Sequence, residues 1–467
     1  MKRDKAAAGS ETWIINGTLY TQDEQRKVFR KNIRIRNGVM DAITSRSPSA
    51  RGENRGRGAN LKIIDARGLT ILPGFVQTHI HLCQTLFRNQ ADDMDLIEWL
   101  TKRIWLMEAA HTPETLYTSA LLGINELLAS GTTCILDMAT VKHTESVFRA
   151  VRDTGIRASV GKCLMDHAPE IPSSSASALS EPTAQALEEA YQLYSKWNNK
   201  ENDRIRASFA PRFAISCSDQ LLKSVAKISR ELNAIVHTHA SENQNEIEIV
   251  RKRFGCENIE CLEQMGLTSP RLVIAHGVWL NPKEQRILKR TGTHVTHCPS
   301  SNLKLASGIA PIPELKALGI NVCLGADGAP CNNSLNIFNE LKLAAILHKP
   351  RIGPKGMPAT EVLDMATRNG AVALNWFDQI GSIEEGKKAD LVAMDLNTLT
   401  NSIPEKLSLD NEAIASSIVY SSDPSHVKWT MVDGKMVYTN GKMSGFSVEK
   451  LQSLMRKAHK TISKGIR

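Results

Sequence analysis

Two histidines separated by one residue, His79 and His81, end an apolar stretch over residues 72–82. In an extended strand, side chains at positions i and i+2 point to the same face, so the two imidazoles project together. Paired imidazoles at a strand end are typical ligands of a divalent cation such as zinc. An HxH pair also occurs by chance among half-buried polar residues, and two ligands do not complete a site. Further ligands must therefore come from elsewhere in the chain.

Similar residues close three later apolar runs: His237, His239 and Glu242 around residue 240, His276 after residues 272–275, and Asp327 after residues 323–325. Each alone is more often a hydrogen-bonded structural residue than a ligand. Together they place imidazoles and carboxylates at the ends of four predicted strands. Neutral imidazoles with one carboxylate bind Zn²⁺ or Fe²⁺ and leave a position for a water whose pKa falls toward 7. Glu242 is then the natural proton shuttle, and His276 is placed to polarise the group under attack.

The elements that position these residues alternate over about 300 residues. Helical spacing of apolar residues recurs between the strands, for example over residues 115–128 and 220–232. The predicted strands cover residues 71–76, 134–138, 158–164, 205–210, 234–239, 272–276, 294–297 and 321–325. Eight strands alternating with helices predict an α/β fold, a (β/α)8 TIM barrel, in which the strand ends carry the chemistry. A doubly wound sheet is the alternative, but the first strands are not followed by GxGxxG.

Both ends of the chain have a different sequence pattern, with short strand candidates bounded by turn residues. The strand candidates are residues 13–20, 32–38 and 61–65 near the N-terminus, and 390–395 and 427–434 near the C-terminus. We therefore predict a small β-sandwich domain built from residues 1–70 and 376–467, with a C-terminal helix, around a barrel of residues 71–375.

Composition indicates a soluble globular protein, with 42% hydrophobic and 23% charged residues among 467. The apolar runs are all shorter than the roughly 18 residues that span a bilayer, so we expect no membrane partner. The polar N-terminus without a signal-peptide core and nine cysteines without a CxxC motif favour reduced thiols in the cytoplasm. The net charge of +9 is spread along the chain, and the basic stretch 51–58 has no aromatic residue to stack bases. We read that stretch as a solvated loop and expect no nucleic-acid partner.

At this point the motifs resemble the amidohydrolase superfamily, and within it the branch of nucleoside, guanine, cytosine and s-triazine hydrolases. Beyond the histidines and Asp327, the resemblance is carried by residues 72–75, 299–305, 332–336 and 381–390. It implies one Zn²⁺ per subunit, with Fe²⁺ as the alternative, held by His79, His81, His239 and Asp327. Binuclear relatives carry a bridging lysine after the fourth strand, and residues 207–213 contain none.

The resemblance also implies roles for the residues around the metal. Glu242 would protonate a ring nitrogen, His276 would contact the attacking water or the tetrahedral adduct, and Asp327 would deprotonate the water and pass a proton to the leaving group. His237 is read as a core residue or one behind the ligands. Relatives are commonly dimers or tetramers, so we expect a homo-oligomer acting on a small heterocyclic substrate.

Two groups of substrate-binding candidates indicate different substrates. Trp99 and Glu108 resemble residues of adenine-nucleoside deaminases that pack the base and bond the ribose, and Lys162 would replace an arginine that binds the carboxylate of S-adenosylhomocysteine. Gln84 and the pair Arg212 and Phe213 resemble positions with which guanine deaminases hold the purine edge, where a guanidinium fork suits a planar heterocycle.

Four functions follow from these signals. The first is a metal-dependent deaminase that releases ammonia from an adenine nucleoside such as 5′-deoxyadenosine, methylthioadenosine or S-adenosylhomocysteine. The second is a guanine or other aminopurine deaminase, and the third is an s-triazine-type chlorohydrolase or aminohydrolase. A non-catalytic scaffold of the same fold is the fourth, although all predicted ligands are present. Cys83 and Cys331 lie near the predicted site, where packing and substrate contact both remain open.

Overall fold

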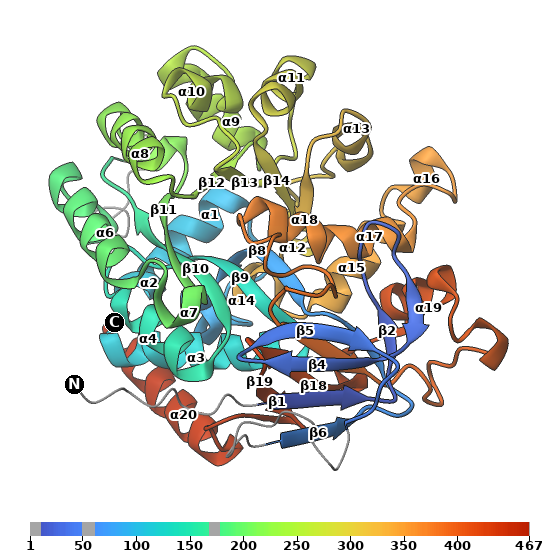
Figure 1. Ribbon diagram of the computed structural model, residues 1–467. Helices are drawn as coiled ribbons and strands as arrows, with labels where there is room; N and C mark the ends of the chain where they lie inside the picture. The colour runs from blue at the N-terminus through green and yellow to red at the C-terminus, as the bar shows by residue number, and fades with distance from the viewer. Residues whose placement is uncertain (1–10, 49–60, 168–177, 467) are drawn as a thin grey trace, which may run out of the picture.

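The protein is described from a computed structural model, which covers residues 11–48, 61–167 and 178–466 (Figure 1). The basic stretch 51–58 lies outside these residues. The largest sheet has nine parallel segments in the order β15-β14-β13-β12-β11-β10-β9-β8-β16. They are β8 (Phe75–His81), β9 (Thr132–Met138), β10 (Arg157–Leu164), β11 (Ile205–Pro211), β12 (Val236–Ala240), β13 (Leu272–His276), β14 (His294–His297), β15 (Val322–Leu324) and β16 (Asp327–Gly328).

The sheet closes on itself through β15 and β16, which are two parts of one eighth strand. β15 pairs with β14, and β16 pairs with β8, the first strand of the barrel. Between them, Gly325 lies so close to β8 that a Cβ there would stand 2.7 Å from the carbonyl oxygen of His79. The predicted (β/α)8 barrel is therefore confirmed, and the doubly wound alternative is wrong.

Helices surround the barrel and cover its strands, as Figure 1 shows. They include α3 (Pro113–Ala129), α4 (Glu145–Thr154), α6 (Thr183–Trp197), α8 (Asp219–Leu232), α9 (Gln244–Phe254), α11 (Pro282–Thr291) and α15 (Ile337–Ile346). The helical spacing over residues 115–128 and 220–232 corresponds to α3 and α8. Thr112 starts α3 with a capping box ahead of Pro113, and the Ser218 hydroxyl caps α8 by accepting the Leu221 N–H.

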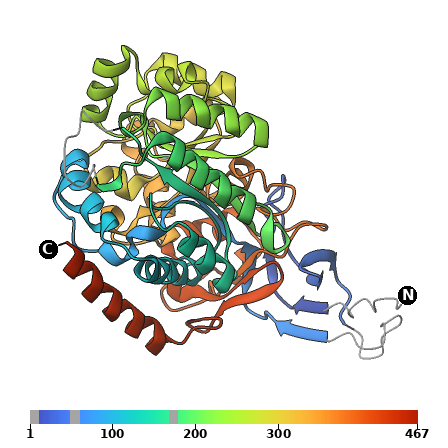
Figure 2. The same cartoon turned by 90° about the vertical axis from the view of Figure 1, so that its left-hand side faces the viewer.

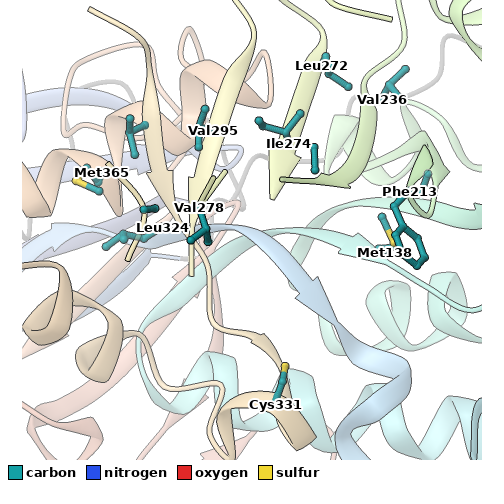
Figure 3. Packing of buried hydrophobic residues seen from close by; sticks show 14 of the residues in the cluster. Met138, Phe213, Val236, Leu272, Ile274, Val278, Val295, Leu324, Cys331 and Met365 are labelled. Atoms are coloured by element: carbon teal, nitrogen blue, oxygen red, sulfur yellow. The ribbon is translucent and has the colours of Figure 1, made fainter. Parts of the chain in front are cut away.

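Alternation along β13 divides its apolar residues between two clusters. Leu272 and Ile274 belong to the large core between strands and helices, part of which is drawn in Figure 3. Val273, which points to the other face of β13, clusters with Cys323 and with Trp376 after the barrel. The interior of the barrel is thus filled with side chains, and buried polar pairs such as Thr78 and Thr296 bond each other within it.

The apolar run predicted as the first barrel strand is corrected by the structure. Residues 70–73 form β7 (Thr70–Pro73), which belongs to a different sheet, and β8 begins only at Phe75. Gly74 lies between them, and the position requires a glycine because a Cβ there would meet Thr133 at 2.1 Å. As a result, His79 and His81 lie within β8 and not after it.

Two smaller sheets come from both ends of the described chain. One has the order β5-β4-β1-β6, and the other has the order β20-β19-β18-β17-β7-β2-β3. The first contains β1 (Glu11–Ile15), β4 (Asn32–Arg36), β5 (Val39–Thr44) and β6 (Leu61–Asp65). The second contains β2 (Thr18–Tyr20), β3 (Val28–Arg30), β7, β17 (Leu391–Met394), β18 (Val427–Val432), β19 (Lys435–Thr439) and β20 (Lys442–Met443). Ile14 and Ile33 of the first sheet share a core with Ile71, Leu391 and Trp429 of the second, which makes a sandwich. Division of the chain at residues 70 and 375 stays a prediction.

The C-terminal helix α20 (Val448–Gly465), red in Figure 2, packs against α3 on the outside of the barrel. All nine cysteines are free thiols, and eight of them are buried. Across the residues that the structure covers, none of the helices combines the length and apolarity that a bilayer crossing requires.

A buried ion pair ties the barrel to the sandwich. The guanidinium of Arg157 on β10 donates to both carboxylate oxygens of Asp390, at 2.7 and 3.0 Å, and both side chains are almost fully buried. The backbone N–H of Asp433 also donates to Asp390. Because the pair is bidentate and excluded from water, each partner depends on the other for solvation.

Replacing Asp390 with Ala should lower the free energy of unfolding by about 3–5 kcal/mol, since it leaves a buried guanidinium without its counter-charge. Urea titration followed by circular dichroism measures this loss. The double variant Arg157→Met with Asp390→Leu removes both charges and should recover much of the stability. A loss below about 1 kcal/mol for Asp390→Ala would show that the pair does not couple the two parts.

Candidate active site

The four predicted metal ligands converge at the C-terminal end of the barrel. One ligand atom from each of His79, His81, His239 and Asp327 lies within 4.8 Å of the others. Asp327 Oδ1 is 3.1 Å from His79 Nε2 and 3.4 Å from His81 Nε2. His81 Nε2 and His239 Nε2 are 3.2 Å apart. β8, β12 and β16 therefore bring together residues that are up to 248 positions apart in the sequence.

The second nitrogen of each of two imidazoles is held by a backbone carbonyl. His81 Nδ1 lies 2.9 Å from the carbonyl oxygen of Met138, and His239 Nδ1 lies 2.7 Å from that of Arg212. A carbonyl oxygen only accepts, so each Nδ1 carries the proton and each Nε2 presents its lone pair to the centre. The partners come from the ends of β9 and β11, which are neighbours of the strands that carry the histidines.

The third imidazole, His79, is held by the histidine whose role the sequence left open. His79 Nδ1 lies 2.8 Å from His237 Nε2, and both rings are fully buried. His237 thus lies behind a predicted ligand and does not belong to the converging group. The sequence reading of His237 as a residue behind the ligands agrees with this position.

The protonation states suit a divalent cation. Burial lowers the pKa of His79, lowers that of His81 to about 4, and holds that of His239 well below its usual range. Burial alone would raise the pKa of Asp327, but the imidazoles of His79, His276 and His81 hold it well below its usual range. Three neutral imidazoles and one carboxylate are zinc-type donors, and His79 Nε2 is buried without a hydrogen-bond partner. The residues present fit a bound metal.

Glu242 and His276 flank this group on one side. His276 Nε2 lies 3.5 Å from Glu242 Oε2 and 3.9 Å from Asp327 Oδ2. Burial raises the pKa of Glu242 to about 7, so its carboxyl holds a proton in part of the molecules at neutral pH. Burial lowers the pKa of His276, but the neighbouring carboxylates of Glu242 and Asp327 outweigh it and raise the pKa overall. The site therefore combines a proton donor, a base and a polarising imidazole.

Two residues that sequence reasoning named only as part of a motif contact these groups directly. They belong to α12 (Pro299–Lys304), which follows β14. Ser301 donates from its hydroxyl to Asp327 Oδ2 at 2.7 Å, and Asn302 Oδ1 lies 2.8 Å from His276 Nδ1. The signal available in the sequence was two hydrogen-bonding residues just after a predicted strand, the position where a barrel places its functional side chains.

A pocket opens over the converging residues. Of the predicted substrate contacts, Gln84, Trp99, Arg212 and Phe213 line it, with His81, His239, Glu242, His276 and Asp327 at its base. Leucines at positions 96, 100 and 305 complete the walls, the first two from the segment α1 (Leu96–Trp99) and η2 (Leu100–Ile104). Among the described residues, Gln84 Oε1 and Trp99 Nε1 are buried without hydrogen-bond partners, which leaves one acceptor and one donor unsatisfied in side chains that line the pocket.

Glu108 joins the two groups of substrate candidates into one network. Its carboxylate accepts from Arg212 Nη1 at 2.7 Å, from Arg212 Nη2 at 3.2 Å and from Gln84 Nε2 at 2.9 Å. Burial would raise the pKa of Glu108, but the Arg212 guanidinium beside it holds the pKa below the ordinary value. Glu108 lies behind Gln84 and Arg212, outside the residues that line the pocket.

Lys162 is not brought to the pocket, which corrects its predicted role. Its Nζ lies 2.9 Å from carboxylate oxygens of both Glu181 and Glu189, and it also donates to the carbonyl oxygen of Val141. Its charge is therefore already neutralised by α6 and the segment before it. The prediction failed because adjacent residues on a strand point to opposite faces, and residue number alone did not settle which face Lys162 takes.

The two cysteines near the site take part in packing. Cys331 donates its thiol hydrogen to the carbonyl oxygen of Gly328 at 3.1 Å, and Cys83 lies in the core between β8 and α3. Neither is among the described residues that line the pocket.

Similarity to known proteins provides evidence that is independent of the geometry of the site. The sequence model described as "Amidohydrolase family" matches residues 70–437. A 5′-deoxyadenosine deaminase of Methanobrevibacter smithii is 40% identical over 398 residues, which is 85% of this chain and 87% of that protein. A 5-methylthioadenosine/S-adenosylhomocysteine deaminase of Syntrophomonas wolfei is 34% identical over 98% of this chain and 96% of that protein. The crystal structure of an adenosine deaminase from Xanthomonas campestris with bound zinc has a TM-score of 0.85 at 28% identity, covering 97% of this chain and 98% of that one.

Replacing His239 with Ala should abolish stoichiometric Zn²⁺ binding, because the three remaining donors no longer surround the cation. Metal content after dialysis, read by elemental analysis, measures the result. His294→Ala serves as the control. His294 is also buried, but it lies at the N-terminal end of β14, whereas the predicted ligands gather at the C-terminal end of the barrel. One retained equivalent of zinc in His239→Ala would overturn the ligand assignment.

Proposed function

This chain belongs to the amidohydrolase family, and we propose from that premise that it is a metal-dependent aminohydrolase that releases ammonia from an adenine nucleoside such as 5′-deoxyadenosine, methylthioadenosine or S-adenosylhomocysteine. The observation that carries the proposal is the buried convergence of His79, His81, His239 and Asp327 beside the carboxyl of Glu242. The names of the relatives with 34–40% identity support the nucleoside substrate.

We assign the three histidines and Asp327 to one Zn²⁺ per subunit, with Fe²⁺ as the alternative. When bound, the cation supplies a Lewis acid that lowers the pKa of a water at its open position. His237 and the carbonyl groups of Met138 and Arg212 orient the three imidazoles. The coordinating side of the site is therefore positioned by hydrogen bonds within this chain.

The proton transfers are assigned to Glu242 and Asp327. Glu242, with a pKa of about 7, donates its proton to a ring nitrogen of the substrate, which makes the adjacent ring carbon electrophilic. Asp327, ionised before the reaction, accepts a proton from the attacking water as the new C–O bond forms. That proton passes to the exocyclic amine, the C–N bond breaks, and ammonia leaves. The new hydroxyl then gives its proton to the Glu242 carboxylate, which leaves the ring as its keto form and restores the Glu242 carboxyl. Asn302 orients the His276 ring by a hydrogen bond to Nδ1, so that Nε2 faces both carboxylates. From there His276 stabilises charge on the oxygen of the attacking water.

The pocket residues are assigned to the heterocycle. Trp99 and Phe213 offer flat apolar surfaces to an aromatic base, and the free Trp99 N–H and Gln84 carbonyl are available for polar atoms at its edge. We assign Glu108 a supporting role, because Arg212 and Gln84 already occupy both of its oxygens. The direct contact of Glu108 with ribose hydroxyls that the resemblance implied requires this network to open.

A guanine or other aminopurine is the second candidate substrate. The observation that favours it is the position of Arg212 and Gln84 in the pocket wall, where a guanidinium and an amide suit a ring that carries an oxo group.

We also propose that the chain acts as a homo-oligomer in the cytoplasm. The homo-oligomer rests on the resemblance, and the cytoplasmic location rests on the free, mostly buried cysteines.

The substrate assignment predicts ammonia release from adenine nucleosides by zinc-loaded protein. A coupled ammonia assay over 5′-deoxyadenosine, methylthioadenosine, S-adenosylhomocysteine, adenosine and guanine measures it, with chloride release followed for a chlorotriazine. Turnover of the nucleosides alone supports the proposal and the role of Trp99. Ammonia from guanine alone would replace the adenine nucleoside with the second candidate, and zinc-loaded protein that turns over none of them would contradict the proposed function.

Glu242→Gln should keep the metal but lose about 10²- to 10⁴-fold in kcat, because an amide has no proton to transfer. Since the Glu242 carboxyl acts in its protonated form, kcat/KM of the wild type should fall as the pH rises through about 7. Stopped assays across this range, with metal content measured in parallel, test both statements. Loss of zinc from Glu242→Gln would show instead that Glu242 is a ligand.

A further inference from the structure

We propose that Glu246 is a positioning residue for the reaction. Its buried carboxylate fixes the backbone of Glu242 and thereby the direction in which the Glu242 carboxyl points. The inference rests on the proposed function, because that function gives Glu242 the proton transfer. It extends that function to a residue outside the pocket, on the first turn of α9.

Glu242 lies in a short, strained turn between β12 and α9. Ser241, the residue before it, has a φ of +55°, in the left-handed region that is unfavourable for non-glycine residues. The carbonyl oxygen of Ser241 accepts the N–H groups of Val278 and Trp279, at 2.8 and 2.9 Å. Both donors follow His276 in the next loop, so the carbonyl side of the turn is held by the loop that carries His276.

The amide side of the turn is held by Glu246. The N–H of Glu242 donates to Glu246 Oε2 at 2.8 Å, and the Glu246 side chain is only 1% exposed. Glu246 is the third residue of α9, whose N-cap is Asn243, so it occupies the glutamate position of a capping box. A capping-box glutamate accepts from the N–H of the N-cap, whereas this one accepts from the N–H of the residue before it.

Glu246 is fixed in turn by α10 (Asn258–Gln264). The side-chain amide of the buried Asn258 donates to Glu246 Oε1. The N–H of the next residue, Ile259, donates to Glu284 Oε1 at 3.0 Å. Glu284 is the third residue of α11 and accepts the N–H of its own N-cap, Asn281, at 3.0 Å. Two buried glutamates, each the third residue of its helix, therefore hold the start of α10, and one of them also holds Glu242.

This arrangement supplies a matched control. Glu246 and Glu284 share burial, helix position and a bond to α10, but Glu246 is the one bonded to the turn at Glu242. A merely structural role in helix capping should affect both sites alike. A positioning role should affect the reaction at Glu246 and leave it unchanged at Glu284.

The experiment compares Glu246→Ala, Glu246→Gln and Glu284→Ala in the full-length, zinc-loaded protein. Glu246→Ala should lower kcat about 10- to 100-fold with KM within about threefold, since misplacing a reacting group by about 1 Å costs that much. Glu246→Gln should restore most of kcat. Its Oε1 still accepts from the Glu242 N–H, and Asn258, whose Oδ1 has no partner, can reverse its amide to accept from the new amide group. Glu284→Ala should lower the melting temperature and leave kcat unchanged.

Hydrogen exchange at residues 240–246 provides a readout that does not depend on the reaction. Exchange there should accelerate in Glu246→Ala and stay at the wild-type rate in Glu284→Ala. If the wild type turned over no substrate, the proposed function would fail. The exchange rates would still test whether Glu246 holds the backbone of Glu242. Should Glu246→Ala not fold, Glu246→Asp takes its place, because it keeps the charge but is too short to reach the Glu242 N–H.

Two results would overturn the proposal. The first is a kcat for Glu246→Ala equal to that of Glu284→Ala at full zinc content. The second is a loss in Glu246→Gln as large as in Glu246→Ala, which would assign the effect to charge and not to the hydrogen bond.

Discussion

The contact between His79 Nε2 and Asp327 Oδ1, at 3.1 Å, is the point on which the rest of the site depends. It forms where the last strand of the barrel, in the segment β16, pairs with the first strand, β8. Gly325 permits that approach because a side chain there would collide with the His79 backbone. A metal site at this position therefore exists only when the barrel is closed, and β12 then brings His239 to the same centre.

Burial is what gives each of these groups its chemical role. Removed from water, the imidazoles stay neutral and the Glu242 carboxyl keeps its proton to a pH of about 7. Asp327 remains ionised because the surrounding imidazoles offset the cost of its burial. Such a group of buried polar atoms is tolerable only if each has a partner, and neighbouring strand ends and α12 supply most of them. The same residues that satisfy these atoms also orient them.

Arg212 links the catalytic side of the pocket with its specificity side. Its carbonyl oxygen holds the Nδ1 of His239, and its guanidinium forms the ion pair with Glu108 in the pocket wall. A change in the wall is thus transmitted to a predicted metal ligand by one residue. On the opposite side, Glu246 of α9 holds the turn that carries Glu242, and Glu284 of α11 holds the start of α10. The ion pair in the pocket wall and the turn that carries Glu242 are therefore held by different hydrogen bonds.

The sequence by itself determined the barrel, its converging histidines and Asp327, and the residues Glu242 and His276. These follow from local periodicity, because a strand is short, alternates strictly and ends at a polar residue. Tertiary structure alone decided which second residue holds each group: Ser301 for Asp327, Asn302 for His276 and Glu246 for Glu242. It also split the run at residues 71–76, turned Lys162 toward two glutamates and joined Glu108 to Arg212, 104 residues away. Such pairings depend on which side chains meet across separate loops, and no spacing within one segment encodes that meeting.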